Sequence, residues 1–341
     1  MIPCLNKWRL LLKRLMLLVT IMLFSRFAPA SAVHGGAHVA ATTTIVADIA
    51  HRIGSPEIEV YPLVPADADS HAYEPTTADV ALVADADLVL TVGAGYEAFL
   101  GRLLENAGGD TPVVEVSRGV EILGYGDHAD EADHDHAEVL GVLGDGLECE
   151  AGHEHEDGDD HAHGNCDPHV WMNPRNVIVW ANNIAEAFAE IDPSNADTYR
   201  ANADAYIAEL EALDAEIQEI VAAVPQDRRI LVTNHEFLRY FAHAYCFEVV
   251  ATVLPGGSTA AELDPQSLAA LIELVRDEGV PAIFAEVSAN PQLAQVIADE
   301  AGVAVVTALY SESLGGAESP APTYLDMMRY NAQTITDALA G

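Results

Sequence analysis

The stretch of sequence that decides the fold covers residues 192–224 and reads DPSNADTYRANADAYIAELEALDAEIQEIVAAV. Apolar residues recur in it at spacings of three and four, which is the pattern of one buried helix face. They are Tyr199, Ala203, Tyr206, Leu210, Leu213, Ile217, Ile220 and Val224. Asp192 and Pro193 are typical of a helix start, and Pro225 ends the run. A helix of about 45–50 Å is longer than one small lobe, so we predict a strut that joins two lobes.

Strand-like and helix-like segments alternate on both sides of this helix. The expected strands before it are 43–47, 58–64, 88–92 and 112–116. The expected strands after it are 230–233, 249–254, 282–287 and 304–308. Runs such as LVLTV lack polar alternation, which is typical of parallel strands buried on both faces. The sequence therefore predicts an α/β fold with two parallel-sheet lobes of four strands each, facing one another across a cleft.

The N-terminus has the parts of an export signal. Basic residues within 7–14 precede a ten-residue apolar run at 15–24, and small residues at 28–32 suit cleavage after Ala32. The run is short for a membrane span, although an uncleaved anchor is the alternative. We predict that the mature protein works outside the cytoplasm, in the periplasm or at the outer cell surface.

The predicted parts of the chain follow from these segments. They are a signal at 1–32, an N-terminal lobe at 33–191 with a polar loop at 127–166, a linking helix at 192–225 and a C-terminal lobe at 226–341. Residues 33–41 are mostly small, and we expect them to form a linker ahead of the first strand.

The charge balance excludes one class of partner. With 54 acidic and 15 basic residues, the formal net charge is −39. Binding to nucleic acid needs a basic surface that neutralises phosphates, and this chain has none.

The loop at 127–166 is acidic and rich in histidine. It holds half of the 14 histidines of the chain and no Lys or Arg. These histidines are His128, His134, His136, His153, His155, His161 and His163. Such a composition cannot form a packed core, but it offers many ligands to a divalent cation. The alternative is a solvated acidic loop whose histidines are incidental.

Two cysteines bracket the second half of this loop. Cys149 and Cys166 could close it with a disulfide in an oxidising compartment, or they could be soft metal ligands. Cys246 is left over, and we expect it to be a small buried residue.

Four possible metal ligands follow predicted strands or end the loop. His71 follows the second strand, His169 ends the polar loop, His235 follows the first strand after the strut, and Glu312 follows the last strand. Because ligands of parallel sheets bind beyond the carboxyl ends of the strands, these side chains are expected to converge between the lobes. Three imidazoles and one carboxylate form a closed set that suits Zn²⁺. The alternative for each single histidine is a surface or capping role.

Glu286 ends the third strand of the second lobe. We expect its carboxylate to orient one of the imidazoles, or to line the cleft. Residues 235–239 begin like the HExxH motif of metalloproteases, but Arg239 stands where the second histidine belongs.

Four segments resemble one family of binding proteins. They are PADADSHAYEPTTADV at 65–80, CDPHVWMNP at 166–174, TNHEFLRYFAHAYCF at 233–247 and ALYSESL at 308–314. They are similar to the signature regions of the receptors of zinc and manganese ABC importers, the cluster A-I solute-binding proteins. The resemblance extends from Thr43 to the C-terminal helix. It implies that one metal ion is bound by His71, His169, His235 and Glu312.

Two departures bear on the metal. The fourth ligand of the family is usually Asp, and Glu312 is one methylene longer. The third is often Glu in the manganese branch, so His235 favours zinc. A histidine-rich loop before the Asp-Pro-His segment is also a trait of the zinc branch, where it is similar to a mobile loop that collects metal.

These observations predict a receptor without catalytic activity that delivers Zn²⁺ to an ABC importer. Its expected partners are the metal ion and the permease and ATPase of the importer, and we expect a monomer. A manganese receptor of the same family is the first alternative. A secreted zinc hydrolase with Glu286 as its base, and a zinc buffer based on the loop alone, are the others.

Overall fold

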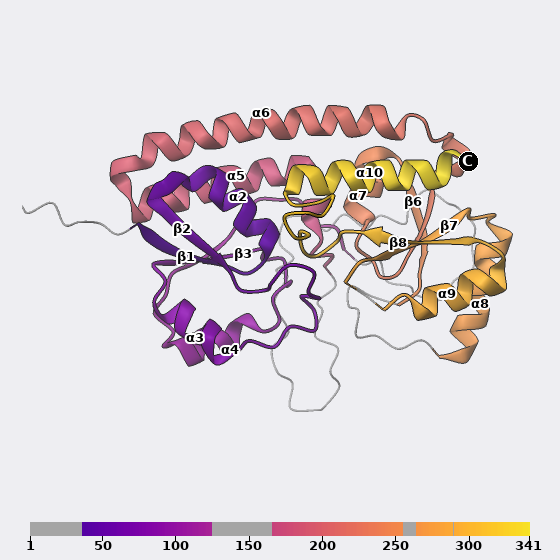
Figure 1. Ribbon diagram of the computed structural model, residues 1–341, viewed down its shortest axis with the longest axis horizontal. Helices are drawn as coiled ribbons and strands as arrows, with labels where there is room; N and C mark the ends of the chain where they lie inside the picture. The colour runs from indigo at the N-terminus through magenta and orange to yellow at the C-terminus, as the bar shows by residue number, and fades with distance from the viewer. Residues whose placement is uncertain (1–35, 125–165, 255–263, 289) are drawn as a thin grey trace, which may run out of the picture. The chain divides into compact units, whose positions relative to one another are not determined.

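A computed structural model describes residues 36–124, 166–254, 264–288 and 290–341. In the N-terminal lobe, four parallel strands lie in the order β2-β1-β3-β4 (Figure 1). They are β1 (Ala37–Ala41), β2 (Ile58–Pro62), β3 (Leu88–Thr91) and β4 (Val113–Glu115). All four residues of β3 are buried, as its nearly all-apolar sequence predicts.

The second lobe repeats this arrangement. Its parallel strands lie in the order β6-β5-β7-β8. They are β5 (Ile230–Thr233), β6 (Glu248–Thr252), β7 (Ala282–Glu286) and β8 (Ala304–Leu309). The predicted fold class of two parallel four-stranded lobes is therefore confirmed.

Helices connect and cover the strands. In the N-terminal half they are α2 (Thr44–Gly54), α3 (Thr77–Ala84), α4 (Leu100–Ala107), α5 (Pro174–Ile191) and α6 (Ala196–Val221). In the C-terminal half they are α7 (Arg239–Tyr245), α8 (Pro265–Asp277), α9 (Gln292–Ala301) and α10 (Tyr324–Ala340). Among the described residues, no helix has the length and apolar character needed to cross a lipid bilayer.

Side-chain caps explain several helix starts. Thr76 and Asp79 form a reciprocal capping box at the start of α3. Asn173 caps α5 and Asp264 caps α8, and each is followed by Pro at the first helical position. Thr323 caps α10 by accepting a hydrogen bond from the Asp326 backbone N–H. These short polar residues satisfy N–H groups that the helix itself leaves unbonded.

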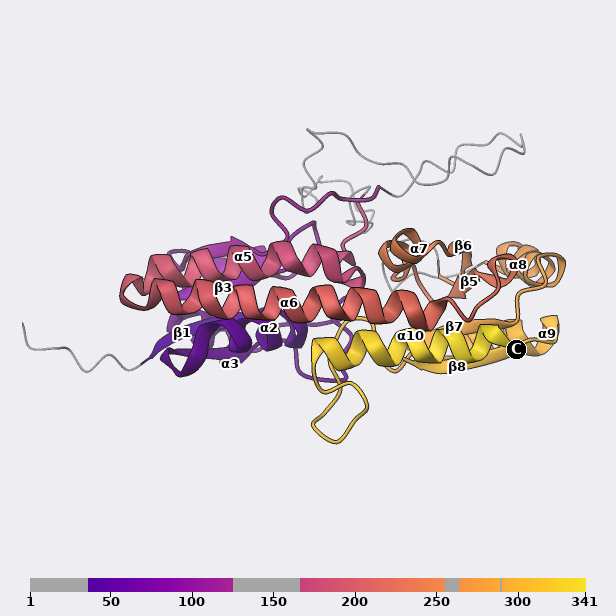
Figure 2. The same ribbon diagram turned by 90° about the horizontal axis from the view of Figure 1, so that it is seen from above.

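The linking helix α6 is shorter than predicted. It has 26 residues, which corresponds to about 39 Å. Residues Pro193–Asn195 form a separate 3₁₀ turn, because the Asp192 carboxylate accepts hydrogen bonds from the side chains of Ser194 and Asn195. Helix α6 packs on α5 and α2 and on α10, so it contacts both halves of the chain (Figure 2).

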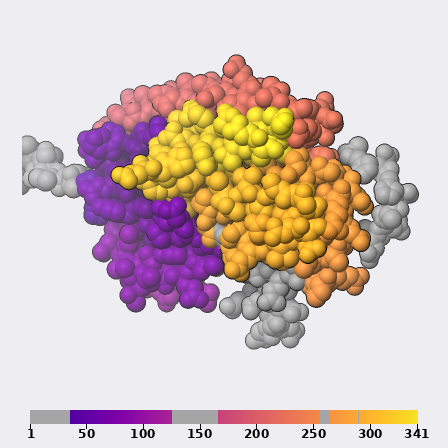
Figure 3. Space-filling model, turned by 45° about the vertical axis from the view of Figure 1, so that its right-hand side comes forward, coloured from indigo at the N-terminus to yellow at the C-terminus, as the bar shows by residue number. Residues whose placement is uncertain are grey.

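One apolar cluster extends through both lobes, beside a smaller cluster within each lobe. A single cluster of buried residues includes Ile45 and Trp180 from the first half and Phe241 and Met328 from the second. In Figure 3 the yellow C-terminal segment lies against the indigo N-terminal lobe. There the backbone N–H of Tyr324 donates to Asp48, at 2.9 Å. A shared core opposes a wide hinge motion between the lobes.

The first predicted strand is wrong. The strand lies at Ala37–Ala41, inside the segment that we expected to be a linker, and the Thr-rich run after it begins α2. Its β-branched residues suggested a strand, but the Thr43 hydroxyl accepts the Val46 N–H and starts the helix. The sequence also predicts helices at 96–106 and 236–245, but α4 begins at Leu100 and α7 at Arg239, three to four residues later.

Cys246 is exposed, which corrects the prediction of a buried residue. It ends α7 in the left-handed conformation, with φ 58° and ψ 45°. The signal at 1–32 and most of the polar loop lie outside the described residues. The predicted domain boundaries stay predictions.

Candidate metal centre

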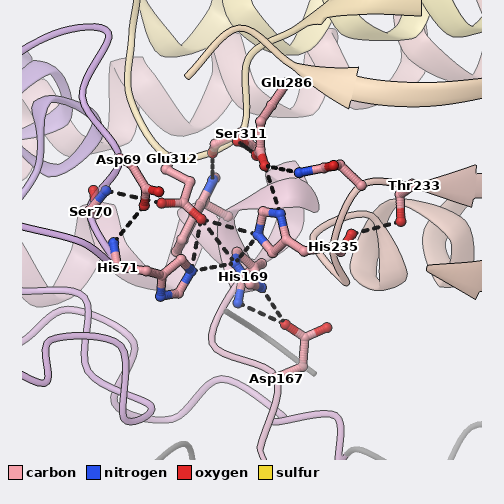
Figure 4. Close-up of polar contacts among 12 residues, drawn as sticks. Asp69, Ser70, His71, Asp167, His169, Thr233, His235, Glu286, Ser311 and Glu312 are labelled. Carbon is pink, nitrogen blue, oxygen red and sulfur yellow. Dashed lines mark hydrogen bonds and ion pairs between the residues drawn. The ribbon is translucent and has the colours of Figure 1, made fainter. Parts of the chain in front are cut away.

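The four predicted donors come from four separate loops and lie together. His71 is in the loop between β2 and α3, and His169 precedes the short turn at Val170–Met172. His235 follows β5, and Glu312 follows β8. One ligand atom of each lies within 4.8 Å of the others (Figure 4). The carboxyl ends of strands from both lobes thus bring nitrogen and oxygen donors to one point.

The Oε1 atom of Glu312 lies among the three imidazoles. It is 2.8 Å from His71 Nε2, 3.1 Å from His235 Nε2 and 3.6 Å from His169 Nε2. The Nε2 atom of His169 lies 3.4 Å from that of His71 and 3.3 Å from that of His235. All four side chains are at most 1% exposed. The cluster is a closed group whose polar atoms face one another.

Asp167 orients His169. One carboxylate oxygen lies 2.8 Å from His169 Nδ1 and accepts the His169 backbone N–H at 3.0 Å. With Nδ1 engaged, Nε2 points to the common centre. The spacing of two residues lets a single aspartate hold both groups.

Glu286 orients His235 in the same way. Its Oε1 atom lies 2.8 Å from His235 Nδ1 and accepts a longer bond from the Asn234 amide at 3.3 Å. The Ser311 hydroxyl donates to the other oxygen. Glu286 therefore joins the end of β7 to the loops that carry His235 and Glu312. It lies against an imidazole, as expected from its position in the sequence.

The second oxygen of Glu312 is turned to the N-terminal lobe. Its Oε2 atom accepts the backbone N–H of Ser70 at 3.1 Å. The Asp69 carboxylate accepts the His71 N–H at 2.9 Å, which folds this loop tightly. One Glu312 oxygen thus faces the imidazoles while the other is held by the backbone next to His71.

Aromatic rings surround the imidazoles. The ring centroid of Tyr96 lies 5.3 Å from that of His71, and the centroid of Trp171 lies 5.4 Å from that of His169. Both aromatic side chains are buried. They keep bulk water from the cluster, so charges in it interact more strongly than at the surface.

The carboxylates and imidazoles shift one another's pKa. Burial lowers the pKa of His235, but Glu286 and Glu312 outweigh it, so the net pKa is well above its ordinary value. Burial also lowers the pKa of His169, and Asp167 with Glu312 raises it above the usual value. For Glu312, burial raises the pKa, but the three histidines hold it well below its usual range. The cluster therefore keeps Glu312 ionised and attracts positive charge.

The other predicted residues fall into two groups. The seven loop histidines and Cys149 lie outside the described residues. Cys166 is disulfide-bonded. It pairs with Gly124 in an isolated antiparallel β-bridge. We call residues 123–124 and 166–167, which flank the polar loop, its neck. The predicted bond to Cys149 remains a prediction.

Sequence reasoning missed several residues that hold the donors. Asp167, Ser70 and Ser311 each bond to a donor or to its orienting carboxylate. The aspartate could have been found from its place two residues before His169. Ser311 and Ser70 act on residues far away in the chain, and no local pattern marks them.

Known proteins resemble this chain over most of its length. The sequence profile of the family described as ZnuA, "Zinc-uptake complex component A periplasmic", matches residues 39–338. The manganese-binding lipoprotein MntA of Halalkalibacterium halodurans is 28% identical over 305 residues, which is 89% of each chain. The manganese ABC transporter substrate-binding lipoprotein PsaA of Streptococcus pneumoniae is 28% identical over 308 residues, again 89% of each.

Solved structures give the same result. The periplasmic zinc binding protein TroA from Treponema pallidum aligns with a TM-score of 0.72 and 25% identity, covering 90% of this chain and 100% of that one. A Mn-bound mutant of a periplasmic metal binding protein from Candidatus Liberibacter asiaticus aligns with a TM-score of 0.72 and 26% identity, covering 89% and 99%. The resemblance found in the four sequence segments is therefore confirmed. The chain belongs to the ZnuA family of periplasmic metal-uptake components, and it is the metal-binding receptor of an ABC importer, acting outside the cytoplasm and without enzymatic activity.

Proposed function

We propose that this receptor binds Zn²⁺ through His71, His169, His235 and Glu312 and passes it to the permease of the importer. The observation that carries the proposal is the closed set of three imidazole nitrogens and one carboxylate oxygen. Nitrogen-rich, four-coordinate sites suit zinc, whereas oxygen-rich, six-coordinate sites suit manganese.

The spacing of the donors supports a tetrahedral ion. Around a zinc ion with Zn–N distances of about 2.0–2.1 Å, neighbouring nitrogens lie about 3.3–3.4 Å apart. The Nε2 atom of His169 lies 3.4 Å from that of His71 and 3.3 Å from that of His235. Both of these nitrogen pairs thus have the spacing expected around a tetrahedral zinc ion.

The number of donors supports the same ion. Ser70 N–H holds the second oxygen of Glu312 at 3.1 Å, so this carboxylate offers one oxygen to the centre. Within the described part of the chain, the group of His, Cys, Asp and Glu donors contains four residues. If Glu312 gave up its bond to Ser70 and offered both oxygens, the four residues would supply five donors, so six-coordination would also need water in a buried site.

Manganese is the second candidate, because relatives such as MntA and PsaA carry manganese in their names. Because Zn²⁺ outcompetes Mn²⁺ at most sites of nitrogen and oxygen donors, relative affinity does not separate the two ions, and the test is uptake. Under the zinc proposal, cells that lack the receptor should lose zinc uptake and keep manganese uptake. The reverse loss would support manganese.

The metal-binding test compares single-residue variants of the exported chain. His169→Ala should lower zinc affinity at least about 100-fold, because it removes a ligand from a four-coordinate ion. His243→Ala is the matched control, since His243 is an exposed residue of α7. X-ray absorption of the zinc-loaded protein should show three nitrogens and one oxygen at tetrahedral distances. Equal affinity for both variants would contradict the proposed site.

The polar loop is proposed to collect cations for this site. Its carboxylates add to the net charge of −39, which attracts cations to the receptor. Deleting residues 127–164 tests its role and also the buffer alternative. One tight zinc site should remain, with slower zinc uptake at low metal concentration. Complete loss of tight binding would support the buffer and contradict the four-residue site.

A further inference from the structure

Tyr240 links α7 to the neck of the polar loop. Its side chain is 3% exposed. Its hydroxyl accepts the backbone N–H of Leu123 at 2.9 Å and donates to the backbone carbonyl of Asp167 at 3.0 Å. Leu123 and Asp167 also pair with each other, since the Asp167 N–H donates to the Leu123 carbonyl at 2.7 Å. One hydroxyl of the second lobe thus bonds to both strands of the neck.

The residue that Tyr240 holds is the one that orients a metal donor. The Asp167 carboxylate contacts His169 at both its backbone N–H and its Nδ1 atom, at 3.0 and 2.8 Å. A displacement of the Asp167 backbone would therefore turn the His169 imidazole. This gives Tyr240 an effect on the donor without contact to the ion.

The same helix is tied to His235 and to the first half of the chain. Helix α7 begins four residues after His235, so its first turn and this donor belong to one continuous segment. At its other end, the Tyr245 hydroxyl donates to the Asp214 carboxylate at 3.0 Å. The Arg175 guanidinium of α5 donates to the same carboxylate at 3.0 Å. Tyr240 thus holds the first turn of α7 to the segment just before His169. Tyr245 holds the last turn of α7 to α6, which follows His169 in the chain.

We propose that Tyr240 is a positioning residue for the metal centre, fixing the Asp167 backbone and so the place of His169 relative to His235. This inference rests on the proposed zinc site. The alternative, that Tyr240 contributes to stability alone, is separated from it by measurements made on the bound metal.

The chemistry of the buried hydroxyl supports this role. Burial, with a further contribution from Asp167, raises the pKa of Tyr240 far above its ordinary value, so the group keeps its proton. It therefore remains both a donor and an acceptor at neutral pH. Removing it leaves the Leu123 N–H and one bond of the Asp167 carbonyl unsatisfied in a buried place, and the neck must shift to reach other partners.

The test compares Tyr240→Phe with Tyr206→Phe in the full exported chain. Tyr206 is the matched control, because its buried hydroxyl on α6 has no hydrogen-bond partner among the described residues. Zinc affinity is measured by competition with a chelating dye, and the visible absorption spectrum is recorded with Co²⁺ in place of zinc. Tyr240→Phe should weaken zinc binding about 10-fold and change the Co²⁺ spectrum. Tyr206→Phe should match the unaltered protein in both.

Asp167→Asn and the double variant extend the test. Because both substitutions act through His169, their combined loss of affinity should be smaller than the product of the separate losses. Independent, multiplicative losses would overturn the inference. An unchanged affinity and Co²⁺ spectrum in Tyr240→Phe would overturn it as well, even if the variant unfolds at a lower temperature.

A measurement on the unaltered chain covers the case in which Tyr240→Phe does not fold. The Leu123 amide donates to Tyr240, so zinc binding should slow its hydrogen exchange. If the exchange rate of the Leu123 amide is the same with and without zinc, the proposed role of Tyr240 is contradicted. If instead His169→Ala leaves zinc affinity unchanged, the zinc site itself is wrong, which is a different failure.

Discussion

Glu312 Oε1 lies 2.8 Å from His71 Nε2, and this contact joins the last loop of the second lobe to the first half of the chain. Neither side chain is more than 1% exposed. The other Glu312 oxygen is bonded to the Ser70 N–H at 3.1 Å. Glu312 is therefore both a candidate donor at the centre and a link between the lobes.

Glu312→Gln tests the anionic donor. The amide keeps the size of the side chain but removes its charge, so zinc affinity should fall at least about 100-fold. The exposed Glu318 lies in the same loop, and Glu318→Gln should bind zinc like the unaltered protein. Isothermal titration with a competing chelator measures both. Binding by Glu312→Gln within about threefold of the unaltered protein would show that this residue is not a ligand.

Glu286→Gln tests the group that orients His235. The carboxylate lies 2.8 Å from His235 Nδ1, and an amide would present a weaker acceptor or a donor there. Zinc affinity should fall about 10–100-fold, while the fold persists. Glu278→Gln, at an exposed position after α8, is the control. Equal affinities for the two variants would contradict an orienting role.

Zinc affinity should depend on pH over an unusually high range. Burial opposes protonation of His169 and His235, but the nearby carboxylates outweigh it and raise both pKa values above the ordinary value. Zinc needs the neutral imidazoles, so protons compete with it. Affinity should therefore begin to fall at a pH above about 6.5 as the solution is acidified. Titrations between about pH 6 and 9 measure this, and a flat profile would refute it.

The stability of the metal-free protein should change in the opposite direction. A histidine with a raised folded-state pKa contributes stability that is fully present below its unfolded pKa of about 6.5. This contribution is lost as the pH rises through the raised value. The melting temperature of zinc-free protein should thus fall toward high pH, because the His–Glu contribution is lost. The melting temperature of zinc-loaded protein should rise over the same range. Parallel changes in the two forms would contradict the assigned pKa directions.

Asp214→Asn tests how the lobes are joined on the side of α6. The Asp214 carboxylate accepts hydrogen bonds from Arg175 at 3.0 Å and from the hydroxyl of Tyr245 at 3.0 Å. Arg175 is largely exposed, which weakens the ionic part through solvent screening. The free energy of unfolding should fall by about 1–3 kcal/mol, measured by urea denaturation. Asp204→Asn, on an exposed face of the same helix, should leave it nearly unchanged.

The sequence alone determined the alternation of strands and helices, the two lobes and the four candidate donor residues. Strands with no polar alternation, such as Leu88–Thr91, are recognisable because both of their faces are buried. His71 and His235 stand beyond strand ends, and a parallel sheet brings such ends to one edge. Local pattern failed at Thr43, where a β-branched run begins a helix, because a hydroxyl cap outweighed strand propensity.

Only the tertiary structure decided how the donors are held. Tyr240 bonds to Leu123 and Asp167, which lie 117 and 73 residues away along the chain. The Ser70 N–H bonds to one oxygen of Glu312, 242 residues away along the chain, and so holds it away from the centre. A hydrogen bond of this kind depends on distances of a few tenths of an ångström between segments that meet only after both lobes have packed. Residue type and spacing can identify the four candidate donors. The orientation of their side chains, and the number of Glu312 oxygens that face the centre, follow from that packing.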